Sequence, residues 1–314
     1  MTTPTAIPDA SSAIVAAVAG TGLMGVGIAT QCALYGYRTL VHDVDPARLA
    51  SVAVKAGAVL DELIDAGRID GDAKADALAR IETHASLDAL APARFVFEAV
   101  PEVLDVKHRL YAQLGDVLAD DAIVASNTSG FEPDRLVAPL RGPERFLIAH
   151  FWNPPHVIPL VEVVPGSATA PDVTQHTVAM MSAIGMEPVV LAKAIPGFIG
   201  NRLQFAVLRE ALNIVRLGAA TPEVVDRVMK ASLGRRWSVV GPFEGADLGG
   251  LDTFVDVATH LLPELATDDR VIDLLREQVD AGRVGVRSGA GFHEWDDARI
   301  DRLKAARRKL IADR

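Results

Sequence analysis

The chain has 314 residues, 50% of them hydrophobic, which is long enough for two domains with substantial cores and indicates a soluble globular protein. Its formal net charge of −10 argues against a nucleic-acid-binding surface, because phosphate binding needs clustered Lys and Arg, and the one dense basic run, residues 302–308, is typical of a solvated helix face. The single cysteine, Cys32, excludes an intramolecular disulfide and a thiolate metal cluster and fits a reducing, cytoplasmic setting.

The N-terminal residues are predicted to be a tail rather than a targeting signal. Residues 1–12 carry no basic segment of the kind that opens a signal peptide, so we expect a short disordered tail. The apolar run at residues 13–35 is long enough to suggest a membrane span, but it holds four glycines within residues 20–27. A buried strand, a turn and a helix explain this run better, and we expect no interaction with a membrane.

The first part of the chain alternates between strands and helices. Residues 14–19 are an apolar run that ends in a glycine turn, residues 26–35 have helical character, and residues 39–44 form a second strand. Asp45-Pro46 is a good N-cap and first-turn proline for the next helix. Further strands are expected near Ile81, at residues 95–100, 123–126 and 146–149, around Glu162 and at 187–191, with helices within 61–80 and at 104–118 and 171–184.

Beyond the Ala-Ile-Pro-Gly segment at residues 194–197, the strand pattern stops and the chain is helical. Thr221-Pro222-Glu223 is an N-cap signature, Gly234 is expected to end that helix, and helices are also expected at 251–262, 271–279 and 300–311. The predicted fold class is α/β, a doubly wound sheet at residues 13–195 followed by an all-helical domain at 196–314. One apolar stripe in steps of four and three places Asn201 on the buried side of its helix, together with Phe205, Leu208, Leu212 and Val215.

A glycine-rich turn joins the first strand to the first helix. Its G-x-G-x-x-G pattern lets the backbone approach a pyrophosphate, whose charge the helix N-terminus stabilises. Asp43 follows at the end of the second strand, where a carboxylate would bind ribose hydroxyls and repel a 2′-phosphate. A purely structural turn is the alternative, but the combined features favour a Rossmann-like domain that binds NAD rather than NADP. The predicted cofactor-binding residues here are Gly20, Gly22, Leu23, Met24, Gly25 and Asp43.

Polar residues follow three of the later strands at the edge where a doubly wound sheet binds its ligand. Glu102 and Lys107 come after the strand at 95–100, Ser126 ends the next strand, and His150 and Asn153 follow the strand at 146–149. Each has an ordinary explanation: Ser126 as part of a helix-cap cluster, Glu102 and Lys107 as an exposed helical pair, Asn153 as a turn residue and His150 as a satisfied core histidine. Their shared placement favours a binding site.

His150 and Glu162 are the predicted catalytic pair. An apolar strand does not carry an inward-facing glutamate without a partner, and a histidine can both pair with it and exchange protons near neutral pH. The alternative is that Glu162 faces solvent on an edge strand. Paired, the carboxylate would orient the imidazole and stabilise imidazolium, so that His150 removes a proton from a secondary alcohol while hydride passes to NAD. His156 is considered only as a substrate contact, and no metal-ligand spacing is present.

Seven motifs in a fixed order resemble the 3-hydroxyacyl-CoA dehydrogenase family, with its lambda-crystallin, gulonate- and carnitine-oxidising relatives. They are AGTGLMG, EAVPE with Lys107, ASNTS, AHFWNPPHVIPLVEVV, PGFIGNRL, GPFEGADLGGLD and GAGF. The resemblance implies a Rossmann-like domain followed by a helical domain that forms a homodimer, with GPFEGADLGGLD at the interface. It also implies that His150 and Glu162 are catalytic, that Ser126 and Asn201 bind the reacting end of the substrate, and that Asp43, Glu102, Lys107, Ser126 and Asn153 contact NAD.

Departures from the family pattern bear on the substrate. Only Lys55 and Lys74 stand between residues 50 and 90, where acyl-CoA members often carry lysines for the CoA phosphate. Arg235 and Arg236 precede the GPFE motif, where a guanidinium could grip a carboxylate or simply be solvated. The first hypothesis is oxidation of a short 3-hydroxyacyl-CoA, such as 3-hydroxybutyryl-CoA. The second is the same chemistry on a free hydroxy acid, and the third is a non-catalytic NAD-binding structural protein.

Overall fold

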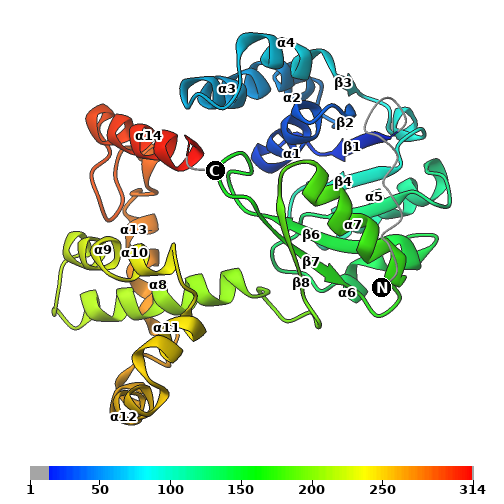
Figure 1. Ribbon diagram of the computed structural model, residues 1–314. Coiled ribbons are helices and arrows are strands. Elements are labelled where there is room, and N and C mark those ends of the chain that lie inside the picture. Colours follow the sequence, from blue (N-terminus) through cyan, green and yellow to red (C-terminus); the bar gives the residue numbers. More distant parts are fainter. Residues whose placement is uncertain (1–13, 313–314) are drawn as a thin grey trace. The chain divides into compact units, whose positions relative to one another are not determined.

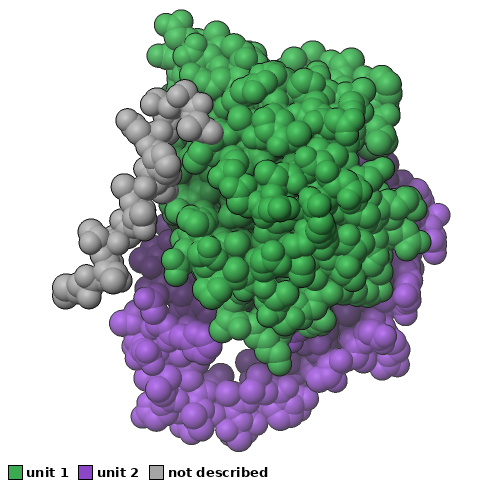
Figure 2. Space-filling model, turned by 90° about the vertical axis from the view of Figure 1, so that its right-hand side faces the viewer, with its two compact units in different colours: residues 1–199, 304–314 green, residues 200–303 purple. Residues whose placement is uncertain are grey.

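The computed structural model describes residues 14–312, and the predicted tail at residues 1–12 lies outside them. The chain forms two compact units (Figure 2). The first extends to Ile199 and also includes the residues from Lys304 onward, and the second is Gly200–Leu303. The division therefore falls after Ile199 rather than after residue 195, and the end of the chain groups with the first unit instead of the second.

The last turns of the C-terminal helix explain this grouping. Helix α14 (Asp297–Ala312) buries Ile311, which is 1% exposed, in an apolar cluster with Leu60 and Leu63 of helix α3 (Val52–Asp65). Beside this contact, Arg308 forms an ion pair with Asp65 at 3.0 Å. A sequence pattern shows that α14 has an apolar side, but it does not identify the surface that covers that side.

One eight-stranded sheet forms the centre of the first unit (Figure 1). Its strand order is β3-β2-β1-β4-β5-β6-β7-β8, and every neighbouring pair is parallel except β6 and β7. The order reverses between β1 and β4, which is the switch point where such sheets bind ligands. The strands are β1 (Val15–Ala19), β2 (Arg38–His42), β3 (Ile81–His84), β4 (Phe95–Glu98), β5 (Ile123–Ser126), β6 (Phe146–Phe151), β7 (Leu160–Pro165) and β8 (Glu187–Val190).

Helices cover both faces of this sheet, which explains why its inner strands are continuously apolar. Successive residues of a strand point to opposite faces, so Val18 of β1 packs in the core under helices α1, α3 and α7, while Ala17 packs in the core under α5 and α6. Figure 1 shows these two layers around the sheet. The helices of this unit are α1 (Leu23–Leu34), α2 (Pro46–Ala50), α3, α4 (Gly71–Ala79), α5 (Leu104–Val117), α6 (Pro133–Val137) and α7 (Pro171–Ala183). The prediction of a doubly wound sheet is confirmed.

The second unit is helical, as predicted, although its helix ends differ from the expected ones. Thr221 caps α9 by accepting a hydrogen bond from the Val224 amide, but α9 ends at Ala231, and Gly234 lies inside the next short helix rather than terminating the first. The GPFE motif opens a helix that the apolar spacing did not predict. The helices are α8 (Gly200–Arg216), α9 (Pro222–Ala231), α10 (Leu233–Trp237), α11 (Pro242–Gly249), α12 (Leu251–Leu261) and α13 (Asp273–Asp280), followed by the start of α14.

The apolar stripe of α8 is less buried than its spacing predicts. Leu212 is 6% exposed, but Phe205 is 59% exposed and Asn201 is only half-buried. Phe243 of α11 is 86% exposed and Leu248 is 78% exposed. The second unit thus leaves large apolar side chains uncovered, a feature that marks interaction surfaces. No helix among residues 14–312 is long and apolar enough to cross a membrane.

Candidate active site

The glycine turn between β1 and α1 has the conformation that its glycines allow. Gly20 has φ +104°, and a Cβ there would lie 2.6 Å from the backbone oxygen of Ala99 at the end of β4. A Cβ on Gly25 would lie 1.9 Å from the Gly20 oxygen. Neither position therefore tolerates a side chain, and the close packing holds the start of α1 against the switch point of the sheet.

The start of α1 fits a pyrophosphate. Gly22 is the N-cap and offers no side chain to the first amides, the first turn has no acidic residue, and a Cβ on Gly22 would meet nothing within 4 Å. Leu23 is 72% exposed, and Met24 is partly buried against the core. Uncapped amides beside open space at a helix N-terminus are suited to binding phosphate oxygens.

Asp43 lies at the end of β2 and braces this turn. It is 7% exposed and accepts hydrogen bonds from the Thr21 amide at 2.9 Å, the Thr21 hydroxyl at 2.7 Å and the Asp45 amide at 3.0 Å. Burial alone would raise the pKa of Asp43, but these hydrogen bonds outweigh it and hold the pKa below its ordinary value. The carboxylate is thus ionised beside the turn, and Thr21 is a partner that the sequence pattern did not identify.

The predicted catalytic pair forms across the one antiparallel step of the sheet. His150 in β6 is the register partner of Glu162 in β7, and its Nδ1 lies 2.9 Å from Glu162 Oε2. His150 is 6% exposed and Glu162 is 1% exposed. Since β8 pairs with β7 on its other side, Glu162 is not on an edge strand, and the solvent-facing alternative is excluded. His150 lies within β6 rather than after it.

Further donors fix the carboxylate of Glu162. The Ile199 amide donates to Oε1 at 2.8 Å, and the Trp152 indole donates to Oε2 at 3.3 Å. With Nδ1–H assigned to the carboxylate, the second imidazole nitrogen, Nε2, is the one that can accept a proton. The ring of Phe198 lies 5.5 Å from the imidazole and adds an apolar wall. This arrangement suits a general base that becomes positively charged.

The polar residues after β4 and β5 form a network, centred on a residue that the sequence analysis did not single out. Glu98, the last residue of β4, is fully buried and accepts hydrogen bonds from Lys107 at 2.7 Å and from the Ser126 hydroxyl at 2.6 Å. Lys107 is 1% exposed and also lies 3.2 Å from Glu102. Ser126 is fully buried, whereas the side chain of Glu102 is 41% exposed.

Burial therefore changes the expected roles within this group. Ser126 and Lys107 were expected to contact a ligand, but both lie beneath the surface with their polar atoms directed to Glu98. Ser129, three residues after Ser126, is the exposed serine of the same loop. Glu98 could have been found by the same sequence signal that identified Glu162, which is a carboxylate inside an apolar strand.

The loop between β6 and β7 places its two candidate residues differently. Asn153 is exposed, so it is available to a ligand. His156 was considered as a substrate contact, but it is 5% exposed and its Nε2 lies 3.1 Å from Glu62 of α3. His156 therefore fastens the loop to α3.

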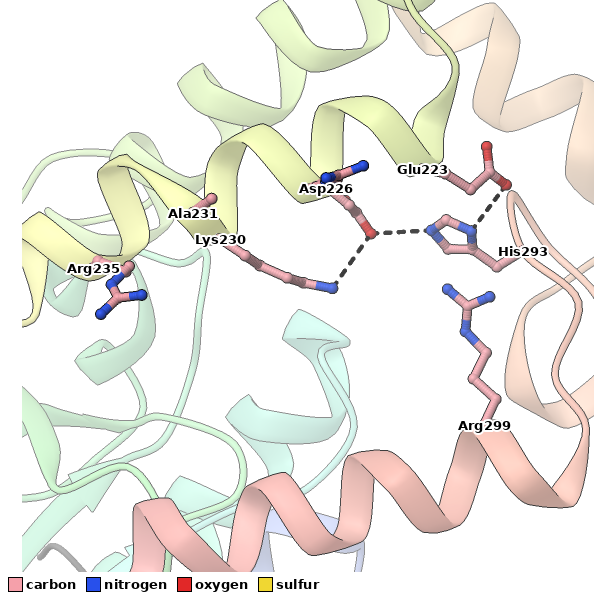
Figure 3. Close-up of a pocket in the computed structure, with 8 residues that line it drawn as sticks. Glu223, Asp226, Lys230, Ala231, Arg235, His293 and Arg299 are labelled. Atoms are coloured by element: carbon pink, nitrogen blue, oxygen red, sulfur yellow. Dashed lines mark hydrogen bonds and ion pairs between the residues drawn. The ribbon is translucent and has the colours of Figure 1, made fainter.

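Asn201 lies in the first turn of α8, in the second unit, and the two arginines of α10 point to different surroundings. The Arg236 side chain lies beside Gly245 of α11. Arg235 lines a pocket of about 390 Å³ in the second unit (Figure 3). In this pocket His293 lies 3.0 Å from Asp226 and 3.3 Å from Glu223, while the other charged lining residues are Arg227, Lys230 and Arg299. Among residues 14–312, no cluster of His, Cys, Asp and Glu could hold a metal ion.

Comparison with known proteins identifies the family. Residues 15–195 match the model of the 3-hydroxyacyl-CoA dehydrogenase NAD binding domain, and residues 197–295 match that of the C-terminal domain. The chain belongs to the 3-hydroxyacyl-CoA dehydrogenase family. The predicted family, fold class and cofactor are thereby confirmed, and the cofactor of this dehydrogenase-like chain is NAD.

Relatives within the family differ in substrate. The 5-formyl-3-hydroxy-2-methylpyridine 4-carboxylate 5-dehydrogenase of Mesorhizobium japonicum is 34% identical, over 95% of this chain and 96% of that protein. A crystal structure of an enzyme of this kind, described as an NAD+-dependent dismutase, has a TM-score of 0.84 and 33% identity over 95% of this chain and 96% of that one. The 3-hydroxybutyryl-CoA dehydrogenase of Bradyrhizobium diazoefficiens is 34% identical, over 90% of this chain and 95% of that protein.

Proposed function

We propose that this protein oxidises the hydroxyl group of a small hydroxy acid with NAD, using His150 as the general base. The observation that carries the proposal is the buried pair of His150 and Glu162 at 2.9 Å. A carboxylate at this depth costs several kcal/mol unless it is paired, and its partner here is a histidine, which can exchange a proton near neutral pH. The pair gives the site a group that can take up a proton.

The protein's part of the reaction is proton removal. Nδ1–H of His150 donates to Glu162, which leaves Nε2 to accept the proton of the substrate hydroxyl. The positive charge that then forms on the ring is stabilised by the ionised carboxylate, which the Ile199 amide and the Trp152 indole hold in place. Bound NAD supplies the hydride acceptor.

The cofactor would be held by groups from several strand ends. The first amides of α1 after Gly22 would bind the pyrophosphate, and Asp43 would accept a ribose hydroxyl with its remaining lone pair. Glu102 and Asn153 are exposed and would contact the cofactor directly. Ser129 replaces Ser126 as the hydroxyl that faces a ligand, while Lys107 supports Glu102 from below. Asn201 remains the proposed contact of the second unit with the reacting end of the substrate.

A free carboxylate is the favoured feature of the substrate. Lys74 in α4 is bound to Asp61 at 2.5 Å, so it is already engaged and only Lys55 remains of the two lysines that could hold a CoA phosphate. Arg235 and Arg236 are both exposed in α10 and make no ion pair within residues 14–312. Arginine binds carboxylates through two parallel hydrogen bonds. The relative that covers 95% of this chain is named for a carboxylate substrate, which agrees with this proposal.

Oxidation of a short 3-hydroxyacyl-CoA is the second candidate. It is favoured by the family itself and by the 34% identity to a 3-hydroxybutyryl-CoA dehydrogenase. The catalytic residues would be the same for both substrate classes, because the class is decided by the groups that hold the carboxylate or the CoA.

Steady-state assays on both classes test the proposal. NADH formation would be followed with L-carnitine, L-gulonate and 3-hydroxybutyrate on one side and with 3-hydroxybutyryl-CoA on the other. We expect turnover with a free acid and a rise in its KM of about tenfold or more in R235A or R236A. Turnover with the CoA ester alone would move the second candidate into first place, and NAD binding without any turnover would favour a structural protein.

The protein is also proposed to be a homodimer formed through its second unit. Support comes from the exposed Phe205, Phe243 and Leu248, because an apolar surface of this kind is usually covered by a partner. Sedimentation analysis should give a dimer for the wild type and a monomer for F243S. V54S is the matched control, since Val54 in the first unit is 76% exposed and lies outside the proposed interface. A monomeric wild-type protein would contradict the proposal.

A further inference from the structure

Glu98 is a second buried carboxylate in the sheet, and four donors satisfy it. Lys107 at 2.7 Å and the Val100 amide at 2.9 Å donate to Oε1, while the hydroxyls of Ser126 and Tyr111 donate to Oε2. Glu98, Ser126 and Tyr111 are fully buried, and Lys107 is 1% exposed. A carboxylate accepts about four hydrogen bonds, so Glu98 has no capacity left for a ligand.

The charge of Glu98 is balanced by a single residue. Lys107 of α5 is its only cationic partner within residues 14–312, and the same ammonium group reaches Glu102 at 3.2 Å. Removing one partner of a buried ion pair is far more destabilising than replacing both partners by apolar residues, because the remaining charge is left unpaired in the interior. The three residues therefore form one unit that links the interior of the sheet to an exposed carboxylate at the cofactor edge.

The loop at residues 126–130 is fastened to this unit at several points. Ser126 is anchored at Glu98, and the Asn127 amide donates to the Glu98 backbone oxygen at 2.8 Å. Farther along, the Thr128 hydroxyl and the Gly130 amide both donate to Glu102 Oε1, the amide at 3.2 Å. The exposed Ser129 lies between Thr128 and Gly130, the two residues that donate to Glu102.

We propose that Glu98 is a positioning residue for the cofactor: with Lys107 it fixes Glu102 and the loop at residues 126–130, and NAD affinity depends on it without contact. The inference rests on the cofactor, which the family establishes, and is independent of the proposed substrate. Because the Ser126 hydroxyl donates a hydrogen bond to the Glu98 carboxylate and the Thr128 hydroxyl donates one to the Glu102 carboxylate, the loop is held by charge-assisted bonds that are stronger than neutral ones.

The groups around Glu98 define what removal of Lys107 would do. Glu98 faces Lys107 and Tyr111 of α5 and Ser126 of β5. Glu102 lies on the far side of the Lys107 ammonium group. Burial and the charge of Glu98 raise the pKa of Tyr111 well above its ordinary value, so the phenol stays a neutral donor. In K107M the carboxylate has no counter-ion, and burial then favours its protonated form.

The test compares NAD affinity with pH in four full-length proteins. Calorimetric titration with NAD at about pH 8.5 and about pH 6 would be performed on the wild type, K107M, E98Q/K107M and K74M. K74M is the matched control, because Lys74 also has a carboxylate partner, Asp61, but at the surface. We expect K74M to match the wild type, and K107M to bind NAD about tenfold more weakly at the higher pH and to recover partly at the lower pH.

The double variant shows whether weaker NAD binding comes from the loss of positioning by Glu98 or only from an unpaired charge that destabilises the fold. E98Q/K107M has no buried charge, so it should lose the pH effect of K107M, yet bind NAD several-fold more weakly than the wild type, because the amide introduced at position 98 cannot accept all three hydrogen bonds that remain, from Val100, Tyr111 and Ser126. Equal affinity of K107M and the wild type at both pH values would overturn the inference. If circular dichroism shows that K107M is unfolded, the double variant decides, and wild-type affinity in that variant overturns it. Failure of the substrate assays would leave these NAD measurements unaffected.

Discussion

Two buried carboxylates in one sheet are stabilised by different partners. Glu162 in β7 is paired with His150 at 2.9 Å, and Glu98 in β4 is paired with Lys107 at 2.7 Å. Both glutamates are at most 1% exposed. A histidine exchanges its proton near neutral pH, whereas a lysine generally keeps its proton there. The first pair is therefore suited to chemistry and the second to holding structure in place.

The comparison also shows how position within the sheet separates the two roles. His150 and Glu162 face each other across an antiparallel step, so a short loop returns the chain to the same edge. Glu98 belongs to the switch point, and its Lys107 comes from the helix that follows the strand. The proposed catalytic pair retains an imidazole nitrogen for a substrate, while every acceptor position of Glu98 is used within the protein.

The largest effect is expected from H150Q. Loss of the general base should lower kcat by about 10³-fold, within the range known for general acid–base catalysis. NAD affinity should be unchanged, because the glutamine side chain still fits between Glu162 and the apolar wall. Stopped-flow turnover and calorimetric NAD titration measure the two quantities, and near-normal turnover would remove His150 from its proposed role.

E162Q should have the next largest effect. An amide oxygen can still accept the His150 Nδ1–H, so the ring keeps its orientation but loses the charge that stabilises imidazolium. We expect kcat to fall about 10²-fold while the variant stays folded. A variant that is inactive because it is unfolded would instead show a lower Tm in a thermal melt.

A matched pair of aromatic variants should separate the two carboxylates. Y111F removes one donor from Glu98, and W152F removes one from Glu162. Y111F is expected to cost about 1–2 kcal/mol of unfolding free energy while kcat stays near that of the wild type. W152F should reverse the pattern, with kcat lowered about threefold to tenfold and a smaller change in stability. Equal effects of both variants on kcat would contradict the division of roles.

The smallest effect is expected for a carboxylate at the surface. Glu62 accepts hydrogen bonds from His156 and Arg307, and its side chain is 40% exposed. Burial alone would raise the pKa of Glu62, but the bonds and charges of His156 and Arg307 outweigh it and hold the pKa below the ordinary 4.5. The contribution of Glu62 to the stability of the fold is therefore fully present above about pH 4.5, and it disappears as the pH falls through the lowered pKa of Glu62.

E62Q tests directly whether the contribution of Glu62 to stability is lost as the pH falls. Urea denaturation at neutral pH should show a loss below about 1 kcal/mol, because solvent screens a pair at this exposure. The difference between E62Q and the wild type should shrink as the pH is lowered through the pKa of Glu62. A difference that grows at acid pH would show that Glu62 acts through something other than its charge.

Sequence patterns predicted the sheet well because its physical signals are local. Continuous apolar runs mark strands covered on both faces, and the glycine turn with Asp43 marks the switch point. The helix ends of the second unit were harder to predict, since Gly234 lies inside a short helix and the GPFE motif opens another. Those ends depend on packing between neighbouring helices, which outweighs the intrinsic preference of one glycine.

The sequence by itself determined the elements of the proposed chemistry: a glycine turn for a dinucleotide and an apolar strand carrying a glutamate near a histidine. These features are visible because burying a charge without a partner is too costly to occur by chance. Only the tertiary structure decided which serine is exposed, since Ser126 and Ser129 are three residues apart, yet Ser126 is buried against Glu98 and Ser129 is exposed. It also decided that Glu98 and Lys107 are interior partners and that Ile311 packs on α3, because burial is a property of surfaces brought together from distant parts of the chain.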